Sequence, residues 1–566
     1  MCSLPLALVL RNMGPMHYVS LGLKVAMALL CCVLAVPPLD FTCIVRSCQM
    51  EQKLRRTRDV TSSISVSLHS LDIYAPTNKP RTVKSLDFIV TTRTVCTALT
   101  LACFSPPSRK LFATPLRSLA TTSQMSPSSP ERHIVIVGGG IIGSTSAYFL
   151  SRHPSYDPSK HKITLLEASK IAGGASGKAG GLLALWAYPS SIVPLSYRLH
   201  KELSDLHGGE ERWGYRALHC GQIDCIGRQL KAEDDVKGKD GEMDGKNATA
   251  VNRKKEGQES VSLQKRDQKA LGKLRAVGVP GDLDWVDAGS VRGYDDMGDP
   301  STTAQVHPYQ FTNAMIELAQ EKGVEVKINS PVSKIVYSDD GKEIKGVTYQ
   351  PQGGEEGTIE ATDVVIAAGP WTSRVLPAAP ISALRAHSVT IRPTRPVSAY
   401  ALFTQIELPA NFGHTNESTR GKGTKRGHKA GYGEQIVSPE IYARPKNEVY
   451  ACGEGDRLVR LPERTDDVAV DEERCQDIVD YCASISDELG QGEITARQAC
   501  YLPNVTAGSG HPLIGPTGVR GEVLAAGHTC WGIQNSCATG KIVSELVFDG
   551  KAKSANIKSL DPRNVL

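Results

Sequence analysis

A glycine-rich turn between two apolar segments is the feature that most constrains this chain. Residues 133–137 (HIVIV) predict a buried strand, and residues 144–153 (STSAYFLSRH) predict a helix from the spacing of their apolar positions. Between them stand Gly138, Gly140 and Gly143, in the spacing of a dinucleotide-binding turn. The first glycine permits the turn, the second lets the backbone approach a pyrophosphate, and the third lets the helix pack on the strand. We therefore predict a strand–turn–helix unit with phosphates at the helix N-terminus.

A second predicted strand supports a nucleotide site. Residues 163–166 are apolar and end in Glu167, which lies 24 residues after Gly143. This is close to the spacing of about 20 residues at which an acidic side chain binds the ribose hydroxyls. A carboxylate at this point repels a 2′-phosphate, so an adenosine ribose without one is favoured. The alternative, a glycine turn in an ordinary strand–helix–strand unit, does not account for Glu167.

Small-residue segments further along favour FAD over NAD. Residues 173–181 (GGASGKAGG) offer bare backbone against which an isoalloxazine ring or ribityl chain can lie. A predicted strand ends at Gly369, and another ends at Gly527 before a helix that is entered around residues 532–536. A helix start beside the flavin would stabilise the anionic reduced ring.

Composition excludes several classes of protein. Of the 566 residues, 40% are apolar and 22% charged, which is typical of globular domains and excludes collagen, a fully disordered chain and a multi-span membrane protein. Residues 131–566 hold 51 basic and 55 acidic side chains, so no nucleic-acid partner is expected. Their eight cysteines form no CxxC pair and no cluster at zinc spacing, which predicts a reducing compartment and no metal site.

Residues 1–130 differ from the rest of the chain. The apolar run 25–36 resembles the core of a signal peptide and is too short for a transmembrane anchor, whereas residues 104–125 resemble a transit peptide. We interpret residues 1–130 as a leader or disordered extension and Met125 as the start of the working protein; a targeting leader is the alternative. The expected location is cytoplasmic, with endosome association, or mitochondria if the leader is real, as alternatives.

Three segments carry a resemblance to a known family. These are residues 441–456 (IYARPKNEVYACGEGD), 500–517 (CYLPNVTAGSGHPLIGPT) and 527–541 (GHTCWGIQNSCATGK). Together with the glycine turn, they resemble the FAD-dependent oxidoreductases of the D-amino-acid-oxidase superfamily, which includes glycine and sarcosine oxidases. The resemblance covers nearly all of residues 131–566. Within the superfamily, the chain is similar to a poorly characterised fungal branch that is linked to endosomal trafficking.

The resemblance implies an α/β fold with a Rossmann-type FAD-binding domain of the glutathione-reductase-2 type and a second, mixed-sheet substrate domain. The FAD-binding domain is expected to comprise residues 131–225, 300–380 and 495–566. The substrate domain is expected to comprise residues 226–299 and 381–494. Two charged insertions within it, residues 231–274 and 414–433, are expected to be disordered loops.

The glycine motifs and the resemblance together predict the cofactor-binding residues. They are Gly138, Gly140, Ile141, Ile142, Gly143, Glu167, Ala168, Ala175, Ser176, Gly180, Gly181, Val332, Ala368, Gly369, Trp371, Cys500, Gly527, Trp531, Gly532 and Ile533. Trp371 is expected to pack against the ring. Cys500 lies near the place where sarcosine-type relatives attach their flavin through a cysteine sulfur, with a buried free thiol as the alternative.

The resemblance also implies three catalytic residues. Arg444 fits the position at which relatives bind a substrate carboxylate, for which a guanidinium fork is suited; the alternative is an Arg at the rim, paired with Glu448 or Glu454. Tyr442 lies two residues earlier on the same strand face and would cover the substrate. His528 would donate to the flavin ring or act as an acid or base, with a structural histidine that caps the turn as the alternative.

The resemblance implies an FAD-dependent oxidoreductase that oxidises a C–N bond of a small amine or amino acid by hydride transfer to flavin N5. A small-molecule substrate is the expected partner. The alternative is an FAD-binding scaffold or trafficking factor, acting between endosome and Golgi with little or no turnover. Trafficking partners are compatible with that alternative, but no motif of the sequence identifies one.

Overall fold

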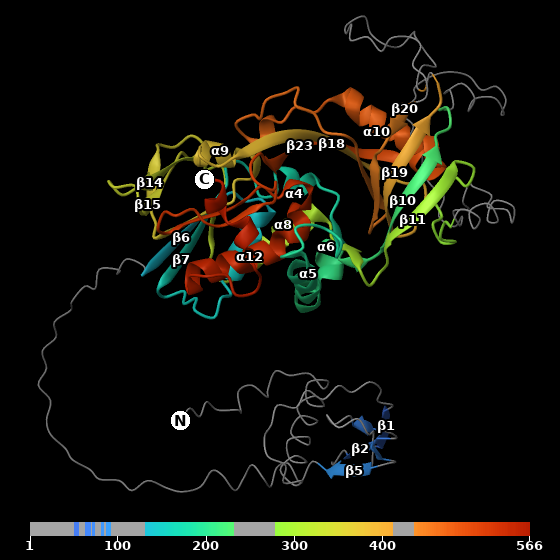
Figure 1. Ribbon diagram of the computed structural model, residues 1–566, viewed down its shortest axis with the longest axis horizontal. Coiled ribbons are helices and arrows are strands. Elements are labelled where there is room, and N and C mark those ends of the chain that lie inside the picture. Colours follow the sequence, from blue (N-terminus) through green and yellow to red (C-terminus); the bar gives the residue numbers. More distant parts are fainter. Residues whose placement is uncertain are drawn as a thin grey trace, which may run out of the picture. The chain divides into compact units, whose positions relative to one another are not determined.

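The computed structural model describes residues 131–230, 278–410, 412 and 435–566, together with the backbone of five strands before residue 92 (Figure 1). The chain divides into two compact units, Met1–Gln124 and Met125–Leu566. The predicted insertions at 231–274 and 414–433 lie outside the described residues, as do the two segments that resemble targeting peptides.

The described part of the first unit consists of short antiparallel strands. One sheet has the order β1-β2-β5, and a separate hairpin joins β3 to β4. Their bounds are Met50–Arg55 (β1), Ser63–Leu68 (β2), Leu71–Ile73 (β3), Arg81–Val83 (β4) and Leu86–Thr91 (β5). The interpretation of residues 1–130 as a leader or extension stays a prediction.

A six-stranded sheet forms the first layer of the second unit, in the order β13-β7-β6-β17-β25-β24. All neighbours are parallel except β24, which is antiparallel to β25. The strands are β6 (Arg132–Val137), β7 (His161–Leu166), β13 (Glu325–Lys327), β17 (Asp363–Ile366), β24 (Leu513–Pro516) and β25 (Glu522–Ala526). The strands predicted at 133–137 and 163–166 are confirmed, and they lie side by side in the sheet.

Alternating side chains of the central strand β6 face two different layers, as the period of a strand requires. Ile134 and Ile136 pack among three helices, whereas Val135 and Val137 pack against a three-stranded antiparallel sheet. The helices are α3 (Ile141–Leu150), α8 (Pro308–Gln320) and α12 (Gly532–Asp549), and the strands are β14 (Val332–Tyr337), β15 (Ile344–Tyr349) and β16 (Gly357–Glu360). Since both faces are covered, the central strand β6 carries an uninterrupted apolar run, Ile134–Val137.

A second, eight-stranded sheet has the order β11-β10-β19-β21-β22-β18-β23, with β20 paired to β19. One of its faces packs on the amphipathic helix α10 (Glu472–Ile485), which is followed by α11 (Asp487–Gly490). The strands are β10 (His219–Ile226), β11 (Val291–Gly298), β18 (Ile381–Arg392), β19 (Tyr400–Leu408), β20 (Gln435–Val437), β21 (Glu440–Arg444), β22 (Glu448–Cys452) and β23 (Glu493–Val505).

The other face of this sheet, which we call the inner face, carries Ala401, Tyr442 and Tyr450, and packs on Leu182. Leu182 opens β8 (Leu182–Ala184), the edge strand of a small antiparallel sheet, β8-β12-β9. The remaining elements are β9 (Arg216–Ala217), β12 (Thr303–Gln305), α4 (Ala175–Lys178), α5 (Val193–His207), α6 (Gly209–Trp213) and α9 (Thr372–Val375). Among the described residues, no helix has both the length and the apolar character needed to cross a membrane.

The long antiparallel pair β18–β23 joins the two sheets, as Figure 1 shows. At one end of β18, Ile381 packs in the core of the six-stranded sheet; further along, Val389 and Ile391 pack in the core under α10.

Two strands of the eight-stranded sheet lie across the predicted domain boundaries. The boundaries at residues 225 and 495 assign β10 and most of β23 to the FAD-binding domain, whereas both strands pair within the eight-stranded sheet. An alternating apolar pattern identifies a strand, but it does not identify the distant strand with which it pairs. The division of Met125–Leu566 into two domains stays a prediction.

Close packing of α12 on α3 requires glycine at position 540. A Cβ atom on Gly540 would lie 2.6 Å from the backbone carbonyl carbon of Thr145, whereas at the exposed Gly281 it would meet no atom of the described residues within 4 Å. We expect Gly540→Ala to lower the free energy of unfolding by about 2 kcal/mol, because the helices must separate. Gly281→Ala, measured by the same thermal and urea unfolding, should change it by less than about 0.5 kcal/mol; equal effects of the two substitutions would contradict this packing argument.

Candidate functional site

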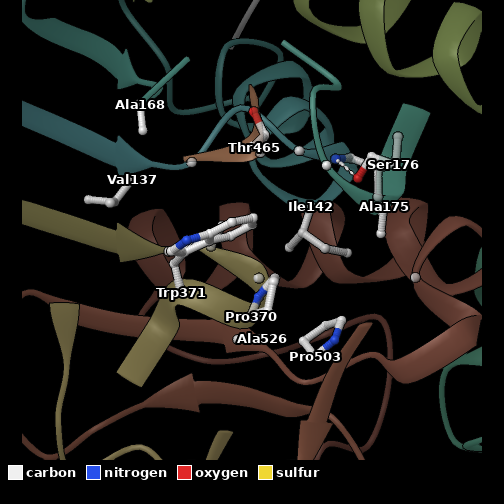
Figure 2. Close-up of a pocket in the computed structure, with 18 of the residues that line it drawn as sticks. Val137, Ile142, Ala168, Ala175, Ser176, Pro370, Trp371, Thr465, Pro503 and Ala526 are labelled. Atoms are coloured by element: carbon white, nitrogen blue, oxygen red, sulfur yellow. Dashed lines mark hydrogen bonds between the residues drawn. The ribbon is translucent and has the colours of Figure 1, made fainter. Parts of the chain in front are cut away.

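A cavity of about 430 Å³ lies at the carboxyl ends of the parallel strands, which is the usual ligand position in such sheets. Val137 of β6, Leu166 of β7 and Ala526 of β25 all line it. Figure 2 shows that its wall also includes Trp371 and Ser176, from segments far apart in the sequence. Segments far apart in the sequence therefore converge on one cavity.

The glycine turn after β6 has the conformation that its spacing predicts. Gly138 has φ +108°, and a Cβ atom there would lie 2.5 Å from the carbonyl oxygen of Ala367. A Cβ atom on Gly143 would lie only 1.9 Å from the carbonyl oxygen of Gly138. Side chains at these two positions would separate α3 from β6 and β6 from β17, so the turn shapes the cavity through backbone contact.

The N-terminus of α3 opens at the cavity. Gly140 is the N-cap and supplies no capping side chain, while the Ile141 N–H donates to Ser176 Oγ at 2.9 Å (Figure 2). Ser176 thus connects the small-residue loop at 173–181 to the glycine turn after β6. Backbone N–H groups and the positive end of the helix dipole are directed at the position where we predict phosphates.

Glu167 joins the ends of β7 and β6. One carboxylate oxygen accepts the Gly139 N–H at 2.7 Å and the other accepts the Ser169 N–H at 2.9 Å. Burial raises the pKa of Glu167, and the backbone N–H donors act against that rise. The carboxyl group lines the cavity, where its remaining lone pairs can accept hydroxyl groups.

The structure brings together most of the predicted cofactor-binding residues. Fifteen of the twenty line this cavity: Gly138, Gly140, Ile141, Ile142, Glu167, Ala168, Ala175, Ser176, Val332, Ala368, Gly369, Trp371, Gly527, Gly532 and Ile533. His528 lines it as well. The structure places seven predicted residues elsewhere: Gly143, Gly180, Gly181, Cys500, Trp531, Arg444 and Tyr442.

Gly180 and Gly181 make close contacts with other parts of the protein. A Cβ atom on Gly180 would lie 2.3 Å from the ring of Tyr442, and one on Gly181 would lie 2.0 Å from the carbonyl oxygen of Val306. Gly181 also has φ +91°, which favours glycine. Contacts within the protein therefore require both glycines, and their role in cofactor binding stays a prediction.

Arg444 is fully engaged within the protein. Its guanidinium donates to Glu448 Oε1 at 2.8 Å, to the carbonyl oxygens of Ala179 and Gly180, and lies 4.8 Å from the ring centre of Tyr450. The pairing with Glu448 is the alternative that the sequence left open. Since Arg444 is buried and these contacts use most of its N–H donors, the residue anchors the loop at 179–180 to β21.

Cys500 and Trp531 lie next to the cavity without lining it. Burial raises the pKa of the Cys500 thiol to about 11, so this cysteine is held protonated. It precedes Leu502 by two residues on β23, and Leu502 is the one that lines the cavity. Trp531 instead packs edge to face on Trp186, with ring centres 5.3 Å apart.

His528 is held in the neutral form. It is buried, and its Nε2 lies 3.0 Å from Thr539 Oγ1 in the first half of α12. Burial lowers the pKa of His528 to about 3. These contacts are compatible with the structural alternative, a histidine that fixes the turn between β25 and α12, and the role of His528 stays a prediction.

Sequence reasoning missed the segment at 463–465. Thr465 and Arg464 line the cavity together with Arg374, and Thr465 Oγ1 is buried with no hydrogen-bond partner among the described residues. A buried hydroxyl without a partner marks a place where a polar ligand group fits. The segment has neither a glycine motif nor a strand pattern, so the sequence alone gives no signal for it. In the structure the indole N–H of the predicted residue Trp371 donates to the carbonyl oxygen of Pro462, next to this segment, at 2.7 Å.

The neutral state of His528 predicts a dependence of stability on pH. An unfolded histidine titrates near pH 6.5, so between about pH 6.5 and pH 3 the unfolded chain binds a proton that folded His528 does not. Stability should therefore fall as the pH falls through this range, with a contribution of about 1.4 kcal/mol per pH unit. His528→Gln, which keeps a donor for Thr539, should flatten the pH dependence of the urea midpoint. Thr539→Val is the control: it removes the same hydrogen bond but keeps the imidazole, so it should lower stability and leave the dependence of the urea midpoint on pH unchanged. An unchanged pH dependence in His528→Gln would refute the neutral state of folded His528.

Comparison with known proteins identifies the family. Residues 133–546 match the family described as FAD dependent oxidoreductase. The putative oxidoreductase TDA3 of Saccharomyces cerevisiae is 36% identical over 525 residues, covering 77% of this chain and 95% of that protein. A putative oxidoreductase of Schizosaccharomyces pombe is 34% identical over 452 residues, covering 77% of this chain and 100% of that protein.

Solved structures share the fold at low sequence identity. Glycine oxidase from Bacillus cereus matches with a TM-score of 0.51 and 18% identity, covering 77% of this chain and 99% of that one. L-Proline dehydrogenase from P. horikoshii matches with a TM-score of 0.50 and 18% identity, covering 77% and 98%. The predicted fold class, a Rossmann-type FAD-binding domain with a second sheet domain, is confirmed. The chain therefore belongs to the family of FAD dependent oxidoreductases.

Proposed function

We propose that this protein oxidises a C–N bond of a small amine or amino acid and that the hydride passes to N5 of the bound FAD. The observation that carries the proposal is the convergence of fifteen predicted cofactor-binding residues on one cavity, in a family that depends on FAD. The names of the glycine oxidase and the L-proline dehydrogenase that share the fold support the substrate class.

The cavity residues fit FAD by their chemistry. The N-terminus of α3 would hold the pyrophosphate, and the Glu167 carboxylate would accept hydrogen bonds from the adenosine ribose. Thr465 Oγ1, which has no partner among the described residues, would bond to a polar group of the cofactor. FAD, once bound, supplies the two-electron acceptor that the side chains of the protein lack.

The rest of the cavity wall would orient the flavin and exclude water. Leu502 and Pro503 of β23 and Ile533 at the start of α12 supply apolar surface. His528, kept neutral by burial, would stabilise the turn at this wall without adding charge beside the ring. We therefore propose a positioning role for His528 and not acid–base chemistry.

Glu167→Gln should weaken FAD binding about tenfold. The carboxylate accepts two backbone N–H groups, so one of them would face the NH₂ of glutamine and lose its acceptor. Leaving a buried donor unpaired costs about 1–3 kcal/mol. The measurement is the FAD dissociation constant of reconstituted apoprotein, followed by flavin fluorescence. Glu325→Gln, which removes a carboxylate at the surface of the neighbouring strand β13, is the matched control and should leave the constant unchanged.

The reaction class is tested by anaerobic bleaching of the bound flavin. A panel of amino acids, N-methyl amino acids, amines without a carboxylate and hydroxy acids is mixed with the holoprotein without oxygen. We expect bleaching by at least one compound that has a C–N bond and none by hydroxy acids. Bleaching by no compound would reject turnover and favour the scaffold alternative, while bleaching by hydroxy acids alone would reject C–N oxidation.

We propose a cytoplasmic location for the protein. The eight cysteines of the described residues are free thiols, as a reducing compartment predicts. The test is fractionation of the native host with an antibody to the protein; recovery in mitochondria or endosomes would overturn the proposal.

A further inference from the structure

Aromatic side chains form a continuous row from the C-terminal turn to the inner face of the eight-stranded sheet. We call Tyr188, Trp531, Trp186, Phe403 and Tyr442 the aromatic row. Successive ring centres lie 5.9, 5.3, 5.9 and 6.1 Å apart, each pair edge to face. In each pair the edge of one ring therefore meets the face of the next, and the row is continuous.

The row begins at the rim of the cofactor cavity and is open to solvent there. Cys530, which lines the cavity, lies beside the row, with its Sγ 4.0 Å from the hydroxyl of Tyr188. Tyr188 is 48% exposed and Trp186 is 38% exposed, although both rings pack against Trp531. Large aromatic side chains left open beside a cavity mark a place where a ligand packs.

A carboxyl group without a cationic partner lies at the inner end of the row. Glu440 accepts the hydroxyl of Tyr442 and lies 3.9 Å from Cys452 Sγ, and among the described residues no Lys or Arg forms an ion pair with it. Burial raises its pKa, as expected for a carboxyl group that lacks a positive neighbour. Burial raises the pKa of the Cys530 thiol at the rim of the cavity, and the charge of Glu440 adds to that rise.

Arg444, the cationic residue that the sequence predicts as a carboxylate-binding group on this face, is not free to bind an anion. Arg444 lies on the same strand face as Glu440 and Tyr442, but its guanidinium is taken up by Glu448 and by the carbonyl oxygens of the loop at 179–180. The inner face thus combines aromatic rings with Glu440, a carboxyl group that has no cationic partner among the described residues. The guanidinium of Arg444 on the same face is already neutralised by Glu448. This chemistry binds a cation and disfavours a carboxylate.

We propose that the substrate is a cationic amine without a carboxylate group, whose ammonium group lies against the aromatic row and pairs with Glu440. Ring faces attract an ammonium ion, and a partly buried carboxylate gains the positive partner that it lacks. The inference rests on the proposed function and narrows its substrate class from amines and amino acids to amines alone.

The test compares two unreactive probes, benzyltrimethylammonium and benzoate, by calorimetric titration of the holoprotein. We expect benzyltrimethylammonium to bind with a dissociation constant at least tenfold lower than that of benzoate. Glu440→Gln, which retains an acceptor for Tyr442, should raise that constant at least tenfold, and Trp186→Leu should raise it several-fold. Glu454→Gln, at an exposed acidic residue after β22, is the matched control and should not change it.

Flavin content is measured for each variant, so that loss of FAD is not mistaken for loss of the cation site. Tighter binding of benzoate, or an unchanged dissociation constant for benzyltrimethylammonium in Glu440→Gln, overturns the inference. If amino acids bleach the flavin and benzoate competes with them, the proposed function stands and only this inference fails. If benzyltrimethylammonium binds through Glu440 but no compound bleaches the flavin, the cation site stands and the proposed reaction fails.

Discussion

The structure depends on the contact between the ends of β6 and β7. There the Glu167 carboxylate accepts an N–H from each of two chain segments, Gly139 in the glycine turn and Ser169 beyond β7. Because two backbone donors converge on one buried carboxyl group, the turn and the next strand keep a fixed spacing. The start of α3, and with it the opening of the cavity, is set by this spacing. The same group is then available at the cavity wall for a ligand hydroxyl.

The parts of the fold that the sequence predicts well are those in which one residue type is required locally. Gly138 needs a positive φ and Gly143 needs the absence of a side chain, so the motif is readable without knowledge of distant partners. The alternation of β6 between two buried faces is likewise a local pattern. For these reasons the nucleotide-binding unit follows from the sequence, and fifteen of the twenty predicted cofactor-binding residues line the cavity.

The predictions that depend on long-range pairing fare differently. The neighbours of β10 and β23 in the eight-stranded sheet are distant in sequence, and the family resemblance, on which the predicted domain bounds rest, does not give this pairing. Arg444 has the right residue type and strand face for an anion site, yet Glu448 and the loop at 179–180 decide its role. Thr465 reaches the cavity from a segment with no motif, which only the folded chain reveals.

The pair β18–β23 couples the two sheets mechanically. Since one continuous strand supplies Ile381 to one core and Val389 to the other, the two sheets cannot swing apart as hinged lobes without breaking this ladder. Large rigid-body opening is therefore a poor route for entry of a reactant. Substrate and product must instead reach and leave the flavin through rearrangement of short segments at the rim of the cavity, such as the segment that contains Trp186 and Tyr188.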